Sequence, residues 1–241
     1  MPRKRFNAFD DFPASESEET RAEPKPIPSA LPAEPVVVER IERLKPSQML
    51  PDRFQPRRLL PTSLRRAFFN GEADCYRTAE AWLALAHNEP AYRAELDRLL
   101  AMGSSFEEHG QIKAITGSWA PSMDGRYIFL IETGERRFWA SCLQKVQHNL
   151  REEPLLRVEV VSHPTRQRQV LENRHAEPPS AVGQACEVAA LILAELGMQP
   201  DAAIGDDFEY FRQARGQRMP TGLWDRIMPI MQLTRTRMVQ L

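Results

Sequence analysis

The sequence predicts an α/β (α+β) domain followed by an all-α domain, and three observations lead to this prediction. Short apolar, β-branched runs alternate with longer segments of helical periodicity up to about residue 175. Beyond that point the periodic segments are all helical. The first 35 residues instead hold seven prolines and a Ser/Glu cluster, so few side chains there could form a core. We therefore expect a disordered tail over 1–35, an α/β domain over 36–175 and a helical domain over 176–241.

Composition excludes several classes of protein. The chain has 241 residues and a formal net charge of -1, and no apolar run approaches the roughly 20 residues that a membrane helix needs. The N-terminus is basic, but no apolar segment follows it, so it does not resemble a secretory signal. The three cysteines are far apart and odd in number, which excludes a disulfide framework and a Cys-x-x-Cys zinc site. We expect a cytoplasmic protein with no membrane partner.

The first half of the α/β domain begins with a strand and continues as helices. The run Val36-Val37-Val38 suits a strand, because β-branched residues favour extended structure. A proline-marked, extended stretch follows over 50–58. From 63 to about 102 the periodicity is helical, with a break at Asn88-Glu89-Pro90 and an end at Gly103-Ser104-Ser105. This part of the chain therefore predicts one strand and two helices.

Strands and helices alternate in the second half of the domain. The first two strands are joined by a turn rich in proline, aspartate and glycine, and Gly134 connects the second strand to a helix. A further strand with alternating valines and a further helix follow. The expected order of strand, strand, helix, strand and helix occupies 112–116, 127–131, 135–147, 156–161 and 165–173.

The last part of the chain predicts a basic helical domain. Pro178-Pro179-Ser180 can start a long helix that reaches Leu196 and stops at Gly197. From Arg212 to the last residue there are six arginines and one acidic residue. Such an excess of positive charge is typical of a phosphate-binding surface, although a solvated helix face would show it too.

The spacing within 223–241 resembles a helix-turn-helix. An amphipathic helix would begin at Leu223 and contain Pro229, which is unfavourable inside a helix. Thr234 is a suitable N-cap for a second helix, from which Arg235 and Arg237 would project outward. Recognition helices contact base edges and phosphates at this position, so these three residues are candidate DNA-binding residues. The chain stops about two turns into that helix, so we expect a longer native protein or a truncated form of it.

Two short motifs could carry chemistry. Gly134-Glu135-Arg136-Arg137 follows an expected strand and opens an expected helix, where free N–H groups and two guanidinium groups favour a phosphate. The alternative interpretation is a turn glycine followed by two surface arginines, which would have the same sequence. Glu172-Asn173 supplies a carboxylate and an amide oxygen, the hard ligands that Mg²⁺ prefers, although the pair could also simply end a helix.

Taken in order, these pieces resemble the ParB partition-protein family, whose N-terminal domain is of the ParB/sulfiredoxin type. The family's opening Gln-Pro-Arg matches Gln55-Pro56-Arg57, and its Gly-Glu-Arg-Arg box matches 134–137 letter for letter. Its glycine-containing strand entry resembles 109–115, and its Glu-Asn box resembles Leu171-Glu172-Asn173. A helix-turn-helix follows in both, so the resemblance covers about residues 40 to 241.

The resemblance implies a function in plasmid or chromosome partition. In that family, the N-terminal domain binds CTP with Mg²⁺, and nucleotide together with DNA closes a dimer into a sliding clamp. Glu172 and Asn173 would then serve Mg²⁺ and, as catalytic residues, CTP hydrolysis. The implied partners are a specific DNA site, a second copy in a homodimer and a ParA-type ATPase, on the nucleoid or a plasmid. The residues implied near CTP are Gly110, Gln111, Gly134, Glu135, Arg136 and Arg137.

Departures from the family pattern keep two other functions open. Ala114 stands where the family has proline, and Ala176 stands where the Glu-Asn box usually carries an arginine, with Arg174 nearby. These changes would suit a transcription regulator that has lost nucleotide binding. Some relatives of this fold are nucleases or phosphotransfer enzymes, in which Glu172 would be a metal ligand or base, although no paired acidic cluster is evident. A helical insertion over about 59–108 also separates this chain from the family.

Overall fold

A computed structural model describes residues 38–122, 125–162, 164–176, 180–198 and 209–241. All of them belong to the unit that spans Ala33–Leu241. The tail expected over 1–35 and the valines at 36 and 37 lie outside the described residues.

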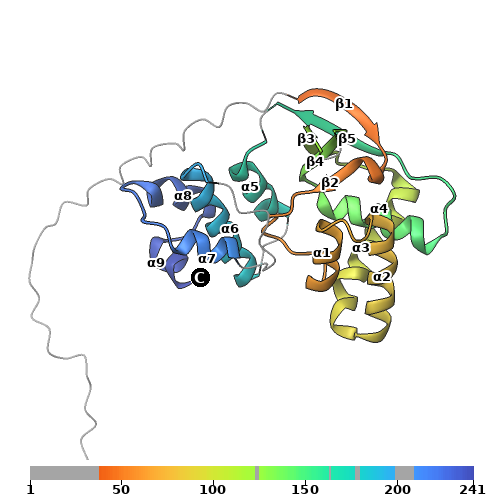
Figure 1. The fold of residues 1–241 in the computed structure, drawn as a ribbon, viewed down its shortest axis with the longest axis horizontal. Coiled ribbons are helices and arrows are strands. Elements are labelled where there is room, and N and C mark those ends of the chain that lie inside the picture. The colour runs from red at the N-terminus through yellow and green to blue at the C-terminus, as the bar shows by residue number, and fades with distance from the viewer. Residues whose placement is uncertain (1–37, 123–124, 163, 177–179, 199–208) are drawn as a thin grey trace, which may run out of the picture. The chain divides into compact units, whose positions relative to one another are not determined.

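The centre of the fold is a mixed five-stranded sheet with the strand order β1-β5-β3-β4-β2 (Figure 1). The outer β1 pairs antiparallel with β5, and β3 pairs antiparallel with β4. The β5–β3 and β4–β2 pairs are parallel. This arrangement confirms a mixed α/β fold. The strands β1 to β5 are, in order, Val38–Leu44, Met49–Pro51, Ile115–Pro121, Tyr127–Thr133 and Leu156–Val161.

Helices α1 to α4 lie together on one side of this sheet in Figure 1, and α4 contacts both α2 and α3. The core between them is aromatic: Trp139 of α4 meets Trp82, Phe68 and Phe138 in edge-to-face pairs. Such pairs contribute stability beyond that gained by burying the rings. The four helices are Thr62–Phe69, Cys75–Asn88, Arg93–His109 and Glu135–Gln147, with 3-10 turns at Pro46–Gln48 and Pro90–Tyr92.

The remaining helices form a second apolar cluster around α6 and α8. Leu191 and Leu193 of α6 and Leu223 and Ile227 of α8 are almost fully buried in it. Helix α5 contributes Val170 to the same cluster. These helices are α5 Arg166–Ala176, α6 Ala181–Glu195, α7 Glu209–Arg215, α8 Leu223–Met231 and α9 Arg235–Gln240.

Two of the expected elements are confirmed in full. The helix over 135–147 and the strand over 156–161 have the expected bounds. Ser180 caps α6 by accepting a hydrogen bond from the Gly183 N–H at 3.2 Å. All three cysteines are buried and free. Among the described helices, none is both long enough and apolar enough to cross a bilayer.

The prediction that a helix ends at Gly103 is wrong, because α3 continues to His109. Gly103 lies where α3 crosses α4, and a Cβ atom there would lie 2.5 Å from Gln144 Oε1 and 3.1 Å from the Ala140 backbone oxygen. This glycine permits helix–helix contact and does not stop the helix.

Two other expected boundaries also differ. The region that was predicted to form two helices contains three, because the segment after Phe69 leaves the helix and Asp74 caps a new one. The strand expected over 112–116 begins at Ile115 and runs to Pro121, so the residues before Ile115 connect α3 to the sheet.

Candidate functional site

The turn between β4 and α4 brings a glycine and two arginines to one point. Strand β4 ends at Thr133 and α4 begins at Glu135, so Gly134 reverses the chain with a φ of +98°. A Cβ atom here would lie 3.0 Å from the Arg137 guanidinium and 3.1 Å from the Ile115 side chain. Glycine avoids both these contacts and the strain of a left-handed residue. The expected strand–glycine–helix connection is therefore confirmed.

The two arginines of this turn are held by different neighbours. Arg137 donates to the Ala114 backbone oxygen at 3.4 Å, and Arg136 Nε lies 3.5 Å from a carboxylate oxygen of Glu95 in α3. Burial lowers the pKa of Arg137, while the Glu172 carboxylate acts to raise it. An arginine keeps its charge under such a shift and carries five N–H donors. Two cations therefore stand at a helix N-terminus, where anions are favoured.

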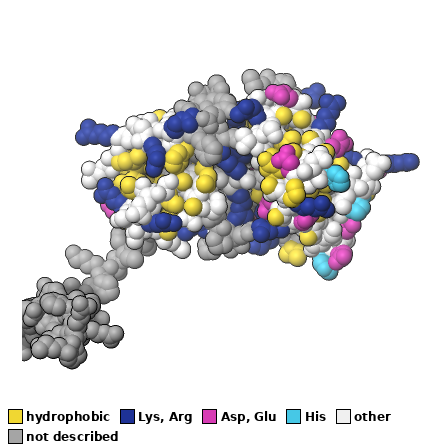
Figure 2. All heavy atoms as spheres, turned by 90° about the horizontal axis from the view of Figure 1, so that it is seen from below, with side chains coloured by type: hydrophobic (Ala, Val, Ile, Leu, Met, Phe, Trp, Pro, Cys, Tyr) yellow, Lys and Arg dark blue, Asp and Glu magenta, His cyan; other side chains and the backbone are white. Residues whose placement is uncertain are grey.

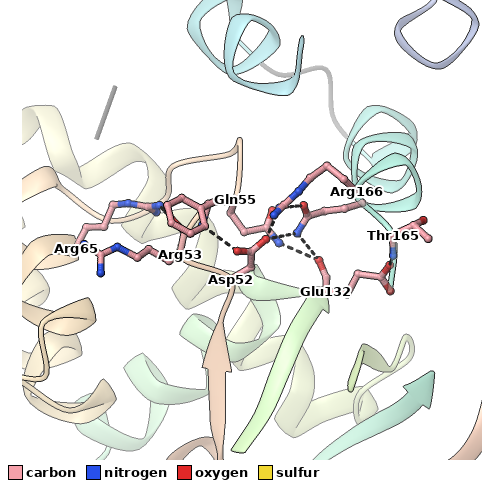
Figure 3. Close-up of polar contacts among 9 residues, drawn as sticks. Asp52, Arg53, Gln55, Arg65, Glu132, Thr165 and Arg166 are labelled. Carbon is pink, nitrogen blue, oxygen red and sulfur yellow. Dashed lines mark hydrogen bonds and ion pairs between the residues drawn. The ribbon is translucent and has the colours of Figure 1, made fainter. Parts of the chain in front are cut away.

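A second segment, Asp52 to Arg57, is held at the end of β4 by a hydrogen bond and lies close to α5. Gln55 is buried, and its side-chain amide donates to the Glu132 backbone oxygen at 2.9 Å. The Asp52 carboxylate forms an ion pair with Arg166 of α5. Figure 3 shows these side chains converging between the end of β4 and the first turn of α5. Because Gln55 is fixed in this way, Arg57 is carried to the side of the α4 N-terminus.

The buried Glu132 carboxylate fixes α5 in the same place. It accepts a hydrogen bond from the Thr165 backbone N–H at 2.8 Å and lies 3.1 Å from Arg168. Burial raises the pKa of Glu132, and these two donors act to lower it. The Gln169 amide adds a bond of 2.9 Å to the Glu132 backbone oxygen. Helix α5 is thus attached to β4 through its first turn, and Glu172 lies farther along the same helix.

These three segments enclose a pocket of about 110 Å³. It brings together residues that are far apart in the sequence, and it gathers most of the residues predicted for a nucleotide. Small-molecule sites usually measure about 300–1,000 Å³, so this pocket has room for one phosphate group and not for a whole nucleotide. The lining residues are Gln55, Arg57, Leu59, Met102, Gly134, Glu135, Arg136, Arg137, Glu172 and Asn173.

The pocket combines positive charge with an unused donor. Arg57, Arg136 and Arg137 are opposed by Glu172 and by Glu135, and burial raises the pKa of Glu135 to about 7. Glu135 accepts a hydrogen bond from the Trp139 indole at 3.1 Å. The Asn173 side-chain nitrogen is buried and makes no hydrogen bond to any described residue. A buried donor without a partner is costly, and a phosphate oxygen would satisfy it.

The fit to Mg²⁺ rests on two residues. Glu172 and Asn173 both line the pocket, and Mg²⁺ usually takes one or two carboxylates and completes its shell with phosphate oxygens and water. No group of three or more histidine, cysteine or acidic side chains with metal-binding geometry occurs among the described residues. The two side chains therefore suit Mg²⁺ together with a phosphate, and do not form a metal site by themselves.

Gly110 and Gln111, which were expected near the nucleotide, lie elsewhere. Both line a different cavity, which shares no residue with the phosphate-sized pocket. The Gln111 side chain is occupied by the β5 backbone: it accepts from the Arg157 N–H at 2.7 Å and donates to the Arg157 oxygen at 2.9 Å. Gly110 ends α3 with a φ of +70°.

The candidate DNA-binding residues lie on α9. The Thr234 hydroxyl caps this helix by accepting from the Arg237 N–H at 3.3 Å, as the sequence predicted. Gln232 has a left-handed conformation and separates α9 from α8. Arg235 and Arg237 are exposed. A helix–turn–helix connection with two outward arginines is therefore present at the expected place.

Sequence reasoning missed some contributors to the pocket. Glu95 belongs to the segment expected as a helical insertion, and it pairs with Arg136 at the pocket. Leu59 and Met102, from the same insertion, line the pocket. Their only signal in the sequence was the amphipathic pattern of the insertion, which indicates packing but not the surface that is covered.

Comparisons with known proteins give no family for this chain: no protein-family model, curated protein or solved structure matches it.

Proposed function

We propose that this chain is a ParB-like DNA-binding protein for plasmid or chromosome partition, whose DNA binding is gated by CTP and Mg²⁺ in the α/β part. The observation that supports this most is the pocket that joins the α4 N-terminus to Glu172 and Asn173 of α5. Two sequence boxes that the resemblance assigns to one nucleotide lie there on the same cavity. Homodimer formation and a ParA-type partner remain parts of the same proposal.

The roles in the pocket follow from its chemistry. Arg136 and Arg137 would bind phosphate oxygens, because a guanidinium offers paired donors that match them. Glu172 and Asn173 would hold Mg²⁺, which supplies charge neutralisation on the phosphates when it is bound. Because the cavity holds only about 110 Å³, the sugar and base must lie outside it or displace a wall.

The first test is calorimetry of CTP, ATP and GTP binding in the presence of Mg²⁺. We expect selective binding of CTP, weakened about 10- to 100-fold by Arg137→Ala, because a hydrogen bond to a charged group contributes about 1.5–3 kcal/mol. Arg77→Ala, an exposed arginine on α2, is the matched control and should bind as the parent does. Glu172→Gln should weaken binding only when Mg²⁺ is present.

Two outcomes would count against the nucleotide part of the proposal. If folded protein binds none of the three nucleotides, with or without DNA, a regulator without a nucleotide switch becomes the better account. Equal affinity in Arg137→Ala and the parent would place any nucleotide site away from the α4 N-terminus.

The second test concerns DNA binding through α9. Figure 2 shows separate Lys and Arg side chains over the end of the molecule at which Figure 1 places α9, and a denser group in the middle of the same face. In fluorescence anisotropy with a labelled duplex, we expect affinity to fall as salt rises. Replacing both Arg235 and Arg237 by alanine should lower the log–log salt slope by about 2, since each phosphate contact contributes about 0.9.

The control for this test removes the same number of charges elsewhere. Arg93 and Arg98 of α3 are exposed arginines outside the helical cluster. Their double alanine variant should keep the salt slope of the parent. Equal slopes for all three proteins would show that α9 does not carry the DNA contacts.

A further inference from the structure

A second cavity, of about 480 Å³, lies at the other end of α4. It is bounded by the last turn of α3, by Ser141 and Gln144 of α4, by the segment 150–155 and by the start of β5. Its volume falls within the range of about 300–1,000 Å³ that is usual for small-molecule sites. It shares no lining residue with the phosphate-sized pocket.

One wall of this cavity presents a buried amide that lacks a partner. Gln144 is only 7% exposed, and its Nε2 atom is buried without a hydrogen bond to any described residue. The neighbouring α3 carries Gly103 at the point of contact, so the Gln144 side chain is accommodated beside that helix. Ser141, one turn earlier on the same face of α4, is also buried. A ligand with a hydrogen-bond acceptor would supply the hydrogen bond that Gln144 Nε2 lacks.

The opposite wall carries like charges on paired strands. Arg43 of β1 lies directly opposite Arg157 of β5 in the antiparallel ladder, and both line the cavity. Like charges in this position destabilise a sheet. Glu107 of α3 also lines the cavity, but one carboxylate offsets only one of the two arginines, so an anion between them would be favourable. The Arg157 Nε atom is buried and makes no hydrogen bond to a described residue, while its guanidinium donates to the Ile112 backbone oxygen at 3.1 Å.

The mouth of the cavity is apolar. Phe106 lines it from α3, and Leu150 and Leu155, which are 39% and 55% exposed, line it from the loop after α4. Exposed apolar side chains around a polar interior are typical of sites that bind a ligand with an apolar body. This cavity, with two arginines and an apolar rim, differs from the first pocket, in which three arginines line a much smaller space.

We propose that this cavity binds a small carboxylic acid with an apolar body, the carboxylate facing Arg157 and Gln144 and the body resting on Phe106 and Leu155. A carboxylate accepts several hydrogen bonds and pairs well with arginine. The site is independent of the proposed nucleotide pocket.

The test uses saturation-transfer and titration NMR on the full chain, with indole-3-acetate, 4-phenylbutyrate and salicylate as probes. We expect at least one acid to bind below millimolar concentration, and its neutral amide analogue to bind at least tenfold more weakly. Leu155→Glu places a carboxylate at the mouth and should weaken binding at least tenfold. Val182→Glu is the matched control, because Val182 is also 55% exposed, and it should bind as the parent does.

Further variants make the outcome decisive. Arg157→Gln and Gln144→Leu should each weaken binding, whereas Arg137→Ala and saturating CTP should leave it unchanged. The proposal is overturned if no acid binds at 5 mM, if acid and amide bind equally, or if Leu155→Glu has no effect. Displacement by CTP would also overturn it, because a single shared site would then explain both ligands. Loss of CTP binding alone would leave this proposal intact and count only against the nucleotide function.

Discussion

Replacing Gly117 by alanine is expected to lower the free energy of unfolding by about 3 kcal/mol, a large part of the 5–15 kcal/mol of a typical domain. Gly117 lies in the middle of β3, next to a register shift between Thr116 and Gly117 in the pairing with β4. A Cβ atom there would lie 2.8 and 2.9 Å from two ring carbons of Phe129, and closer still to the Leu130 backbone oxygen. Neither neighbour is free to move away.

The reason is that both neighbours are fixed by the sheet and its core. The Phe129 side chain is completely buried and packs against Trp119 with ring centroids 5.7 Å apart. The Leu130 oxygen belongs to the backbone of β4, so its displacement would disturb the β3–β4 ladder. Overpacking of this kind forces backbone shifts rather than a change of rotamer.

The measurement is equilibrium unfolding in urea, with Gly216→Ala as the control. A Cβ atom at Gly216 would meet only backbone oxygens at 3.5 and 3.6 Å, which is ordinary contact. We expect that variant to stay within about 0.5 kcal/mol of the parent, as is usual for surface changes. A Gly117→Ala protein of parental stability would show that β3 and β4 are not paired in this register.

The sequence was sufficient where a feature depends on neighbouring residues. The strand–glycine–helix turn at Gly134 was predicted with the bounds of α4, because a left-handed glycine and the change of period are both local signals. Thr234 was predicted as an N-cap for the same reason and makes the expected hydrogen bond, and the helix expected to start at Pro178-Pro179-Ser180 begins directly after Ser180.

The sequence failed where a residue is chosen for a distant contact. Gly103-Ser104-Ser105 has the sequence of a helix C-terminus, yet Gly103 lies inside α3, at the point where α4 crosses it. Gln111 has an amide group that could bind a nucleotide, but the β5 backbone both donates to its oxygen and accepts from its nitrogen. Neither contact leaves a trace in the local pattern, since the partner residues are 30 or more positions away.

The burial of Glu187 in α6 does have a local signal in the sequence. Glu187 is the single charged residue between Ala181 and Leu193, where every other residue except Gln184 is apolar or glycine. A lone carboxylate in such a segment predicts a buried charge, because apolar residues surround it on every face of the helix. The structure places it fully buried beside Arg174 of α5, with 3.7 Å between the charged atoms.

Replacing Glu187 by glutamine is expected to stabilise the protein at high pH and to have little effect near pH 4.5. Both carboxylate oxygens of Glu187 are buried without a hydrogen-bond partner among the described residues. Burial raises the pKa of Glu187 from 4.5 to about 7, although Arg174 and Arg57 act to lower it. Between these two pH values the folded protein holds a proton that the unfolded chain has released. Stability must therefore fall as pH rises through this range.

The size of the effect follows from the shift. A pKa displaced by this amount corresponds to about 3 kcal/mol between pH 4.5 and 8. Glutamine is neutral throughout and removes the contribution of this carboxyl. The difference in unfolding free energy between Glu187→Gln and the parent should therefore grow from near zero at pH 4.5 to about 3 kcal/mol at pH 8.

Urea unfolding of both proteins across this pH range measures the difference directly. Glu108→Gln, whose side chain is 72% exposed, is the control and should differ from the parent by less than about 0.5 kcal/mol at every pH. Glu135 also carries a raised pKa, of about 7, but it contributes equally to the parent and to Glu187→Gln and so cancels in the comparison. A difference that does not change with pH would mean that Glu187 is ionised in the folded protein throughout. Arg174 would then be a full counter-charge, and the contact between α5 and α6 would rest on a true ion pair rather than on a protonated acid.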